Sequence, residues 1–246
     1  MNNIQETLLF PVRDTEARKQ FLFACLIVLA GFIVPILPFL ALTGYCTKIM
    51  RQVIEERKSP SMPEWQGSDW STMLTDGLRL YGAQLVLTLP LLLVMGCGFI
   101  SMIGGSMTLS VASYENVNEL LSVGILFFLF GIGFMMLFSI LSLPYGVIIS
   151  AVGPHVVTER SFAAAFQFKD WWKIFRKGLG QFILSYAITM GLSFVFIFVM
   201  QFAMMTIVLM CVFPLVLIPY TAYITLLTNT LYAQAYLAGK DALGTN

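Results

Sequence analysis

Long hydrophobic runs, separated by shorter polar or charged segments, occupy most of this sequence. The runs at about 21–45, 81–103 and 120–153 are each long enough for a helix of about 20 residues to cross a bilayer. The run at 182–237 is too long for one crossing, and we divide it near Phe213-Pro214. The pattern predicts an all-α integral membrane protein with about five transmembrane helices, four to six being possible.

One polar stretch occurs twice. Asp69–Leu78 returns as Asp170–Leu179, an offset of 101 residues, with an Asp-Trp pair and a Gly-Leu pair kept in both. The residues that define the copies are Asp69, Gly77, Asp170 and Gly178. We therefore predict one membrane domain over 1–246, built from a repeat. Its parts are repeat one at about 21–103, repeat two at about 120–210 and a final span at about 214–237.

Both copies have the periodicity of an amphipathic helix, with each aspartate as a possible N-cap. The predicted apolar faces are Trp70, Leu74, Gly77 and Tyr81 in the first copy, and Trp171, Phe175, Gly178 and Phe182 in the second. The opposite faces carry Thr72, Thr75, Asp76 and Arg79 in the first copy, and Lys173, Arg176 and Lys177 in the second. Such helices lie along membrane surfaces, where tryptophan is also favoured. The candidate contacts to lipid or a partner are Trp65, Trp70, Trp171, Trp172, Lys173, Arg176 and Lys177.

Basic residues are concentrated in the two connectors that contain these copies. Five Lys or Arg lie between Cys46 and Leu80, five lie between Pro154 and Gln181, and the polar loop expected at 104–119 has none. Because cytoplasmic loops are rich in Lys and Arg, both connectors are predicted to be cytoplasmic and the repeats parallel. We expect a multi-pass protein of the cell membrane, such as a bacterial inner membrane.

The side of the N-terminus is left open. Five spans place it outside, whereas Arg13, Arg18 and Lys19 favour the cytoplasm. The conflict disappears if 21–45 is a re-entrant hairpin that turns at Pro35 to Pro38, since each arm is too short to cross.

Several short motifs resemble one known family. They are Gly44-Tyr45 leading to Lys48 and Arg51, Pro63-Glu64-Trp65, Asp69-Trp70, Asp76-Gly77-Leu78, and a tail from Thr228 to Lys240. Together they resemble the bacterial and archaeal membrane proteins grouped as domain-of-unknown-function 4013. The resemblance implies packed spans with amphipathic inserts over most of the chain, and it supplies no catalytic residue.

Composition narrows the function classes. The chain is 58% hydrophobic and 11% charged, against roughly 25% charged residues in soluble domains. Net charge is +1, so nucleic acid is not expected as a partner. The four cysteines are not spaced for a metal site, the spans contain no acidic or basic residue, and no nucleotide or hydrolase motif occurs. We expect neither catalysis nor a cofactor.

Two functions remain open. The first is an accessory or scaffold subunit of a membrane complex, whose basic amphipathic helices hold lipids or a partner on the cytoplasmic leaflet. The alternative is a passive conduit for a small or lipidic solute, with backbone carbonyls freed where proline breaks a helix. The prolines in question are Pro35, Pro38, Pro90, Pro144, Pro214 and Pro219.

Overall fold

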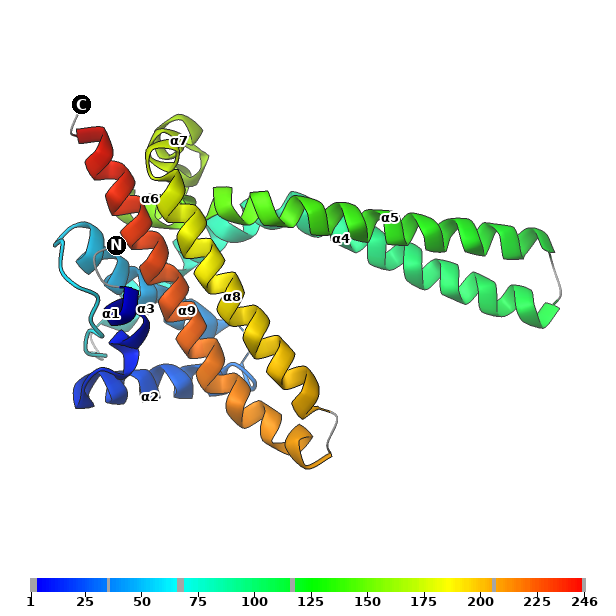
Figure 1. Cartoon of the computed structure of the whole chain (residues 1–246), viewed down its shortest axis with the longest axis horizontal. Helices are drawn as coiled ribbons and strands as arrows, with labels where there is room; N and C mark the ends of the chain where they lie inside the picture. The colour runs from blue at the N-terminus through cyan, green and yellow to red at the C-terminus, as the bar shows by residue number, and fades with distance from the viewer. Residues whose placement is uncertain (1–3, 35, 66–68, 116–117, 205–206, 245–246) are drawn as a thin grey trace. The chain divides into compact units, whose positions relative to one another are not determined.

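The structure is a computed structural model that describes residues 4–34, 36–65, 69–115, 118–204 and 207–244. These residues form helices and no β-strand, which confirms the predicted all-α class. The elements, coloured along the chain in Figure 1, are α1 (Ile4–Leu9), η1 (Phe10–Val12), α2 (Thr15–Ala30), α3 (Leu37–Ile54), α4 (Trp70–Glu115), α5 (Asn118–Ile149), α6 (Val152–Glu159), η3 (Phe162–Phe166), α7 (Phe168–Lys177), α8 (Leu179–Ala203) and α9 (Ile207–Gly244).

Four segments of the described chain are long and apolar enough to cross a membrane. They are Trp70–Tyr114, Asn118–Glu159, Leu179–Ala203 and Phe213–Gly244. A helix needs about 20 predominantly apolar residues to span the hydrocarbon core, and each segment exceeds that length. These four helices indicate a membrane protein.

The run at 21–45 is not one helix, so the expected fifth span is wrong. α2 ends at Ala30 and α3 begins at Leu37. Pro38 lies in the first turn of α3, where a missing backbone N–H breaks no hydrogen bond, and Pro35 lies outside the described residues. α2 and α3 contact each other, so the chain turns back between them.

The polar loop expected at 104–119 is also wrong, because α4 continues to Glu115 and α5 begins at Asn118. The hydroxyls of Thr108, Ser110 and Ser113 donate to carbonyl oxygens four residues earlier, at 2.8, 3.0 and 2.8 Å. Polar side chains that bond to their own helix in this way do not interrupt it.

The remaining prolines do not break helices either. Pro90, Pro144, Pro214 and Pro219 lie inside α4, α5 and α9. The division expected near Phe213-Pro214 falls earlier in the chain, since α8 ends at Ala203 and α9 begins at Ile207.

Contacts divide the chain into two compact units, residues 85–146 and the rest. All 14 Lys and Arg residues belong to the larger unit. The smaller unit is a hairpin of α4 and α5 whose helices approach closely at glycines. A Cβ added to Gly105 would lie 2.6 Å from the backbone N of Phe128, and one added to Gly131 would lie 2.7 Å from that of Met102. Small residues permit such backbone contact between membrane helices.

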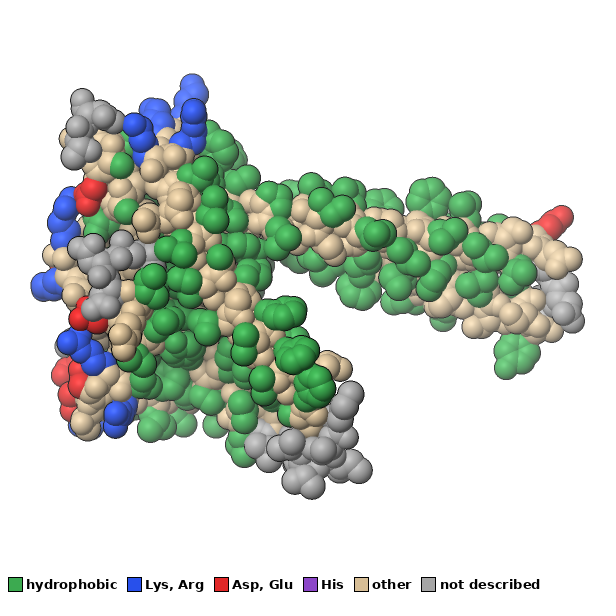
Figure 2. Space-filling view, viewed as in Figure 1, with side chains coloured by type: hydrophobic (Ala, Val, Ile, Leu, Met, Phe, Trp, Pro, Cys, Tyr) green, Lys and Arg blue, Asp and Glu red, His purple; other side chains and the backbone are tan. Residues whose placement is uncertain are grey.

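In the larger unit, α9 is the central helix. It packs against α8, α3, α2 and α7, and Leu226, Leu227 and Leu231 of α9 are fully buried. Figure 1 shows α8 and α9 running side by side in opposite directions. In Figure 2 the charged side chains of this unit gather on the side away from the turn between α8 and α9. One side of the unit is therefore polar.

Candidate functional site

The segment before α4 is fastened to α2 and α3. The hydroxyl of Tyr45 donates to the carbonyl of Pro63 at 2.6 Å, and its ring stacks on Trp65 with the ring centroids 4.0 Å apart. The backbone N and the indole N of Trp65 both donate to Gln20, each at 3.3 Å. Burial raises the pKa of the Tyr45 phenol, so the group stays a neutral donor. Trp65 is thus half-buried within the fold.

Ion pairs join α3 to the start of α4. Lys48 Nζ lies 2.6 Å from a carboxylate oxygen of Asp69, and Arg51 lies 2.8 Å from Asp76. Arg79 approaches the other oxygen of Asp76 at 3.3 Å. The Asp76 side chain is only 8% exposed, so two guanidinium groups compensate one buried carboxylate.

In the first copy, the face of the helix that packs inside the protein differs from the predicted apolar face. Trp70 and Tyr81 are exposed and Leu74 is half-buried, whereas Asp76, expected on the polar face, is buried. The buried face also contains Gly77. The cations of α3 lie beside this face, and their charge makes burial of the aspartate possible.

Gly77 and Gly44 mark the place where α4 crosses α3. A Cβ on Gly77 would overlap the carbonyl of Leu40 and lie 2.9 Å from the backbone N of Gly44. A Cβ on Gly44 would in turn overlap the carbonyl of Met73. The two backbones therefore touch, and neither position has room for a side chain.

The second copy and α9 also approach each other closely, at Gly178 and Gly239. A Cβ on Gly178 would lie 3.0 Å from the carbonyl O of Ala235 and 3.1 Å from the Cα of Gly239. A Cβ on Gly239 would lie 2.5 Å from the carbonyl O of Ile174. In both copies the contact involves the glycine and the residue four positions before it.

In α7, Trp171 and Phe175 are buried and the basic side chains are exposed. The Trp171 indole donates to the carbonyl of Ala165 at 3.2 Å, which fixes the helix to the preceding segment. The expectation that aspartate caps this copy is wrong. Asp170 is the third residue of α7, and Gln167 occupies the N-cap without a side-chain hydrogen bond.

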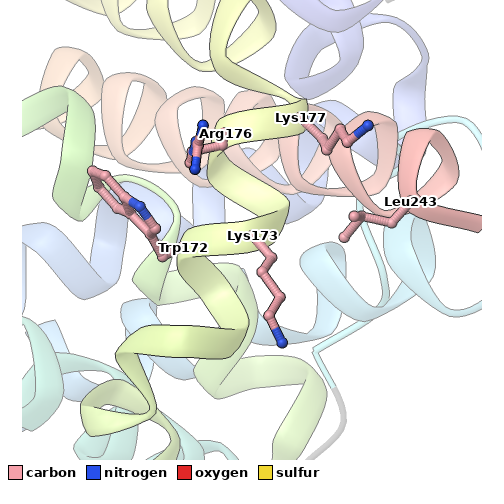
Figure 3. A pocket seen from close by; sticks show the side chains of 5 residues that line it. All are labelled: Trp172, Lys173, Arg176, Lys177 and Leu243. Atoms are coloured by element: carbon pink, nitrogen blue, oxygen red, sulfur yellow. The ribbon is translucent and has the colours of Figure 1, made fainter.

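The outer side of α7 forms what we call the basic patch, an open pocket of about 360 Å³. Its lining is Trp172, Lys173, Arg176, Lys177 and Leu243, drawn in Figure 3. Figure 3 shows that the first four extend from one helix and Leu243 from another. The Trp172 ring stacks on Phe175, with centroids 5.2 Å apart.

Charge compensation in the basic patch is weak. Among the described residues, the acidic group within 4.0 Å of these cations is Asp170, whose carboxylate lies 3.7 Å from Lys173 Nζ. Arg176 and Lys177 form no ion pair with any described residue. Such a surface suits a ligand with negative charge and some apolar character.

The candidate residues from the sequence thus fall into two groups. Trp65, Trp70, Asp69 and Gly77 lie around the start of α4, where the rings of Trp65 and Trp70 are 6.0 Å apart. The others, Asp170, Trp171, Trp172, Lys173, Arg176, Lys177 and Gly178, belong to α7 and its end. The sequence analysis missed the ion pairs of Lys48 with Asp69 and of Arg51 with Asp76. A signal was present, because Lys48 and Arg51 are spaced to lie on one helix face, and so are Asp69 and Asp76.

Comparison with known proteins agrees with the motifs around α3 and α4. The family model described as "Protein of unknown function (DUF4013)" matches residues 27–209, well over half of the chain. The similarity expected for the tail from Thr228 to Lys240 falls outside that range. No curated protein and no solved structure matches the chain. The chain therefore belongs to the DUF4013 family, whose function is unknown.

Proposed function

We propose that this is a non-catalytic membrane protein, an accessory or scaffold subunit, that holds anionic lipid headgroups with the basic patch of α7. The observation that carries the proposal is the set of exposed cations without strong acidic partners, namely Lys173, Arg176 and Lys177. Each cation near an anionic membrane surface contributes about 1 kcal/mol. Trp172 beside them suits the interface between headgroups and acyl chains.

The first copy supports this proposal by contrast. Asp76 occupies the position that Lys177 occupies in the second copy, and its charge is satisfied inside the chain by Arg51 and Arg79. Among the described residues, no acidic side chain of another helix forms an ion pair with the cations of α7. The cations of the second copy are therefore available to a ligand, whereas the acid of the first copy serves the fold.

The two copies form a parallel internal repeat in this proposal. Gly77 and Gly178 are equivalent positions, but the glycines that they meet, Gly44 and Gly239, are not. Buried hydroxyls do correspond. Thr47 and Ser150 each donate to the carbonyl three residues earlier, at 2.7 and 2.6 Å. Downstream, Arg57 and Arg160 have left-handed backbones, with φ of 53° and 50°. Both pairs are separated by 103 residues, close to the 101 residues that separate the glycines.

All basic segments lie on the cytoplasmic side. Glu55 of the first connector pairs with Arg160 of the second at 3.4 Å, and Arg57 pairs with Asp241 near the C-terminus at 2.6 Å. Four crossings, by α4, α5, α8 and α9, bring the chain back to this side. α1 to α3 stay on it as a re-entrant or interfacial segment, so the N-terminal cations are cytoplasmic as well.

The test is lipid binding by the full chain in mixed micelles, measured by native mass spectrometry. We compare phosphatidylglycerol with phosphatidylcholine for the wild type and for K173Q/R176Q/K177Q. Loss of three cations worth about 1 kcal/mol each predicts that preference for the anionic lipid falls roughly 100-fold.

Two controls separate charge from fold. K173R/R176K/K177R keeps the charge and should keep the preference. R13Q/R18Q/K19Q removes three cations outside the basic patch and should lower the preference much less than K173Q/R176Q/K177Q does. Equal binding of phosphatidylglycerol by the wild type and K173Q/R176Q/K177Q would refute lipid holding by α7. A protein that co-purifies with the wild type and is lost from the variant would instead assign the patch to a partner subunit.

A further inference from the structure

A second group of cations surrounds a narrow cavity where α3, α4 and the end of α6 meet. The cavity has a volume of about 10 Å³, and the polar residues that line it are Thr47, Arg51, Asp76, Arg79 and Arg160. This space is about the size of one water molecule or one ligand oxygen. The three arginines come from three different segments, so a group bound here would join them.

The charges at the cavity are not balanced. Asp76 forms ion pairs with Arg51 at 2.8 Å and with Arg79 at 3.3 Å, so each of its oxygens already has a guanidinium partner. Glu55 pairs with Arg160 at 3.4 Å, and both of these side chains are substantially exposed. Three guanidinium groups therefore meet two carboxylates, which leaves one positive charge.

One donor at this position is unused. The Nε of Arg51 is buried and has no acceptor among the described residues. Buried donors are nearly always paired, because an unpaired one has lost its water without compensation. An acceptor atom in the cavity that Arg51 lines would provide the missing partner.

Arg160 adds a local feature of its own. It ends α6 in the left-handed region, with φ 50° and ψ 29°, which costs a non-glycine residue about 1–2 kcal/mol. Strained backbone of this kind is common at ligand-binding positions. Its side chain is 62% exposed and that of Arg79 is 42% exposed, so both can be reached by a ligand from outside.

We propose that Arg51, Arg79 and Arg160 bind a phosphate group, either that of a lipid headgroup or free inorganic phosphate. One phosphate oxygen enters the cavity and accepts from Arg51 Nε. The remaining oxygens stay at the entrance, where Arg79 and Arg160 donate to them. Guanidinium forks match phosphate geometry better than ammonium groups do. This site is separate from the basic patch, which contains none of its residues.

The experiment uses the full chain carrying K173Q/R176Q/K177Q, so that the basic patch cannot contribute. The protein is placed in phosphatidylcholine nanodiscs, and thermal unfolding is followed during titration with inorganic phosphate. A second arm replaces part of the lipid with phosphatidic acid. A ligand that binds only the folded state raises Tm with concentration. We expect such a rise in at least one arm, and the arm in which it occurs identifies the source of the phosphate.

The test variants are R79Q and R160Q, because both side chains are exposed and Arg51 remains to compensate Asp76. Each is expected to weaken phosphate binding about 10-fold or more. R160K should weaken it less, since it keeps the charge and loses the fork. The matched control is R57Q. Arg57 is also left-handed and 65% exposed, and its partner is Asp241.

R57Q is expected to bind phosphate as the parent does. The proposal is overturned if neither phosphate nor phosphatidic acid raises Tm in the parent. It is also overturned if R79Q and R160Q bind as tightly as R57Q, because the arginines at the cavity would then be irrelevant.

Discussion

Gly77 of α4 lies against the backbone of Gly44 of α3, with only 2.9 Å between a Cβ built on Gly77 and the N of Gly44. The relation is repeated by Gly178 and Gly239, where the Cβ would be 3.1 Å from the facing Cα. A side chain at any of these positions would separate two helices. These contacts fix where α3 lies on α4, and where α9 lies beside α7 and α8.

Replacing Gly77 or Gly178 by alanine should destabilise the protein by about 1–3 kcal/mol, because the new methyl group meets backbone, which cannot move aside like a side chain. Thermal unfolding in mild detergent, followed by size-exclusion fluorescence, measures the effect. Gly180→Ala is the control, since nothing lies within 4 Å of its Cβ. Tm of G180A should be unchanged or slightly raised. Equal losses for G178A and G180A would contradict the contact.

Removing the acid that joins α3 and α4 should also be costly. Asp76→Asn leaves Arg51 largely buried without its counter-charge, which is expected to cost about 3 kcal/mol. Glu16→Gln breaks an exposed pair with Lys19 and should have little effect, because water screens such a pair. The comparison is made by denaturation of both variants in the same detergent. A D76N protein as stable as E16Q would show that the buried pair does not hold the two helices together.

The two copies differ in how far the sequence predicts them. The apolar side of α7 can be predicted from the sequence of that segment alone. Helical spacing places Trp171 and Phe175 on one side, and the fold buries both. The buried side of α4 depends on Lys48 and Arg51, which belong to another helix and reverse the preference of Asp76. The periodicity of the α4 segment alone cannot predict that basic residues of α3 will lie against it.

A distance measurement can test whether α4 continues as a helix beyond residue 103. Spin labels at Gly96 and Ser110, in a chain whose native cysteines are replaced, should be about 21 Å apart if 1.5 Å per residue holds between them. Double electron–electron resonance should then give one narrow distance distribution. A broad distribution centred elsewhere would indicate that residues 104–110 form a loop.

Composition explains why the sequence predicts a loop in this segment. Serine and glycine are frequent in loops, and residues 104–113 contain three serines, two glycines and one threonine. Their hydroxyls instead bond back to the helix, and Gly105 lies against α5. By contrast, the prolines of the first hydrophobic run predict that its helix is interrupted, and α2 does end at Ala30 while α3 begins at Leu37. The sequence alone does not decide between one span and two short arms.

Topology can be checked by labelling single cysteines with a membrane-impermeant maleimide in intact cells. Cysteines at Ser59 and Lys169 lie in the two connectors and should react only after the membrane is permeabilised. One at Asn118, at the start of α5, should react without permeabilisation. Reaction of either connector from outside would contradict parallel repeats with cytoplasmic basic segments.

The most direct test of lipid holding is to purify the wild-type chain and K173Q/R176Q/K177Q from their own membrane in mild detergent and quantify everything bound by mass spectrometry. Binding through the basic patch predicts that the wild type carries anionic phospholipid at about one molecule per chain or more, and that the variant loses most of it while keeping its neutral lipid. The same anionic lipid content in both proteins would contradict the proposed role of α7.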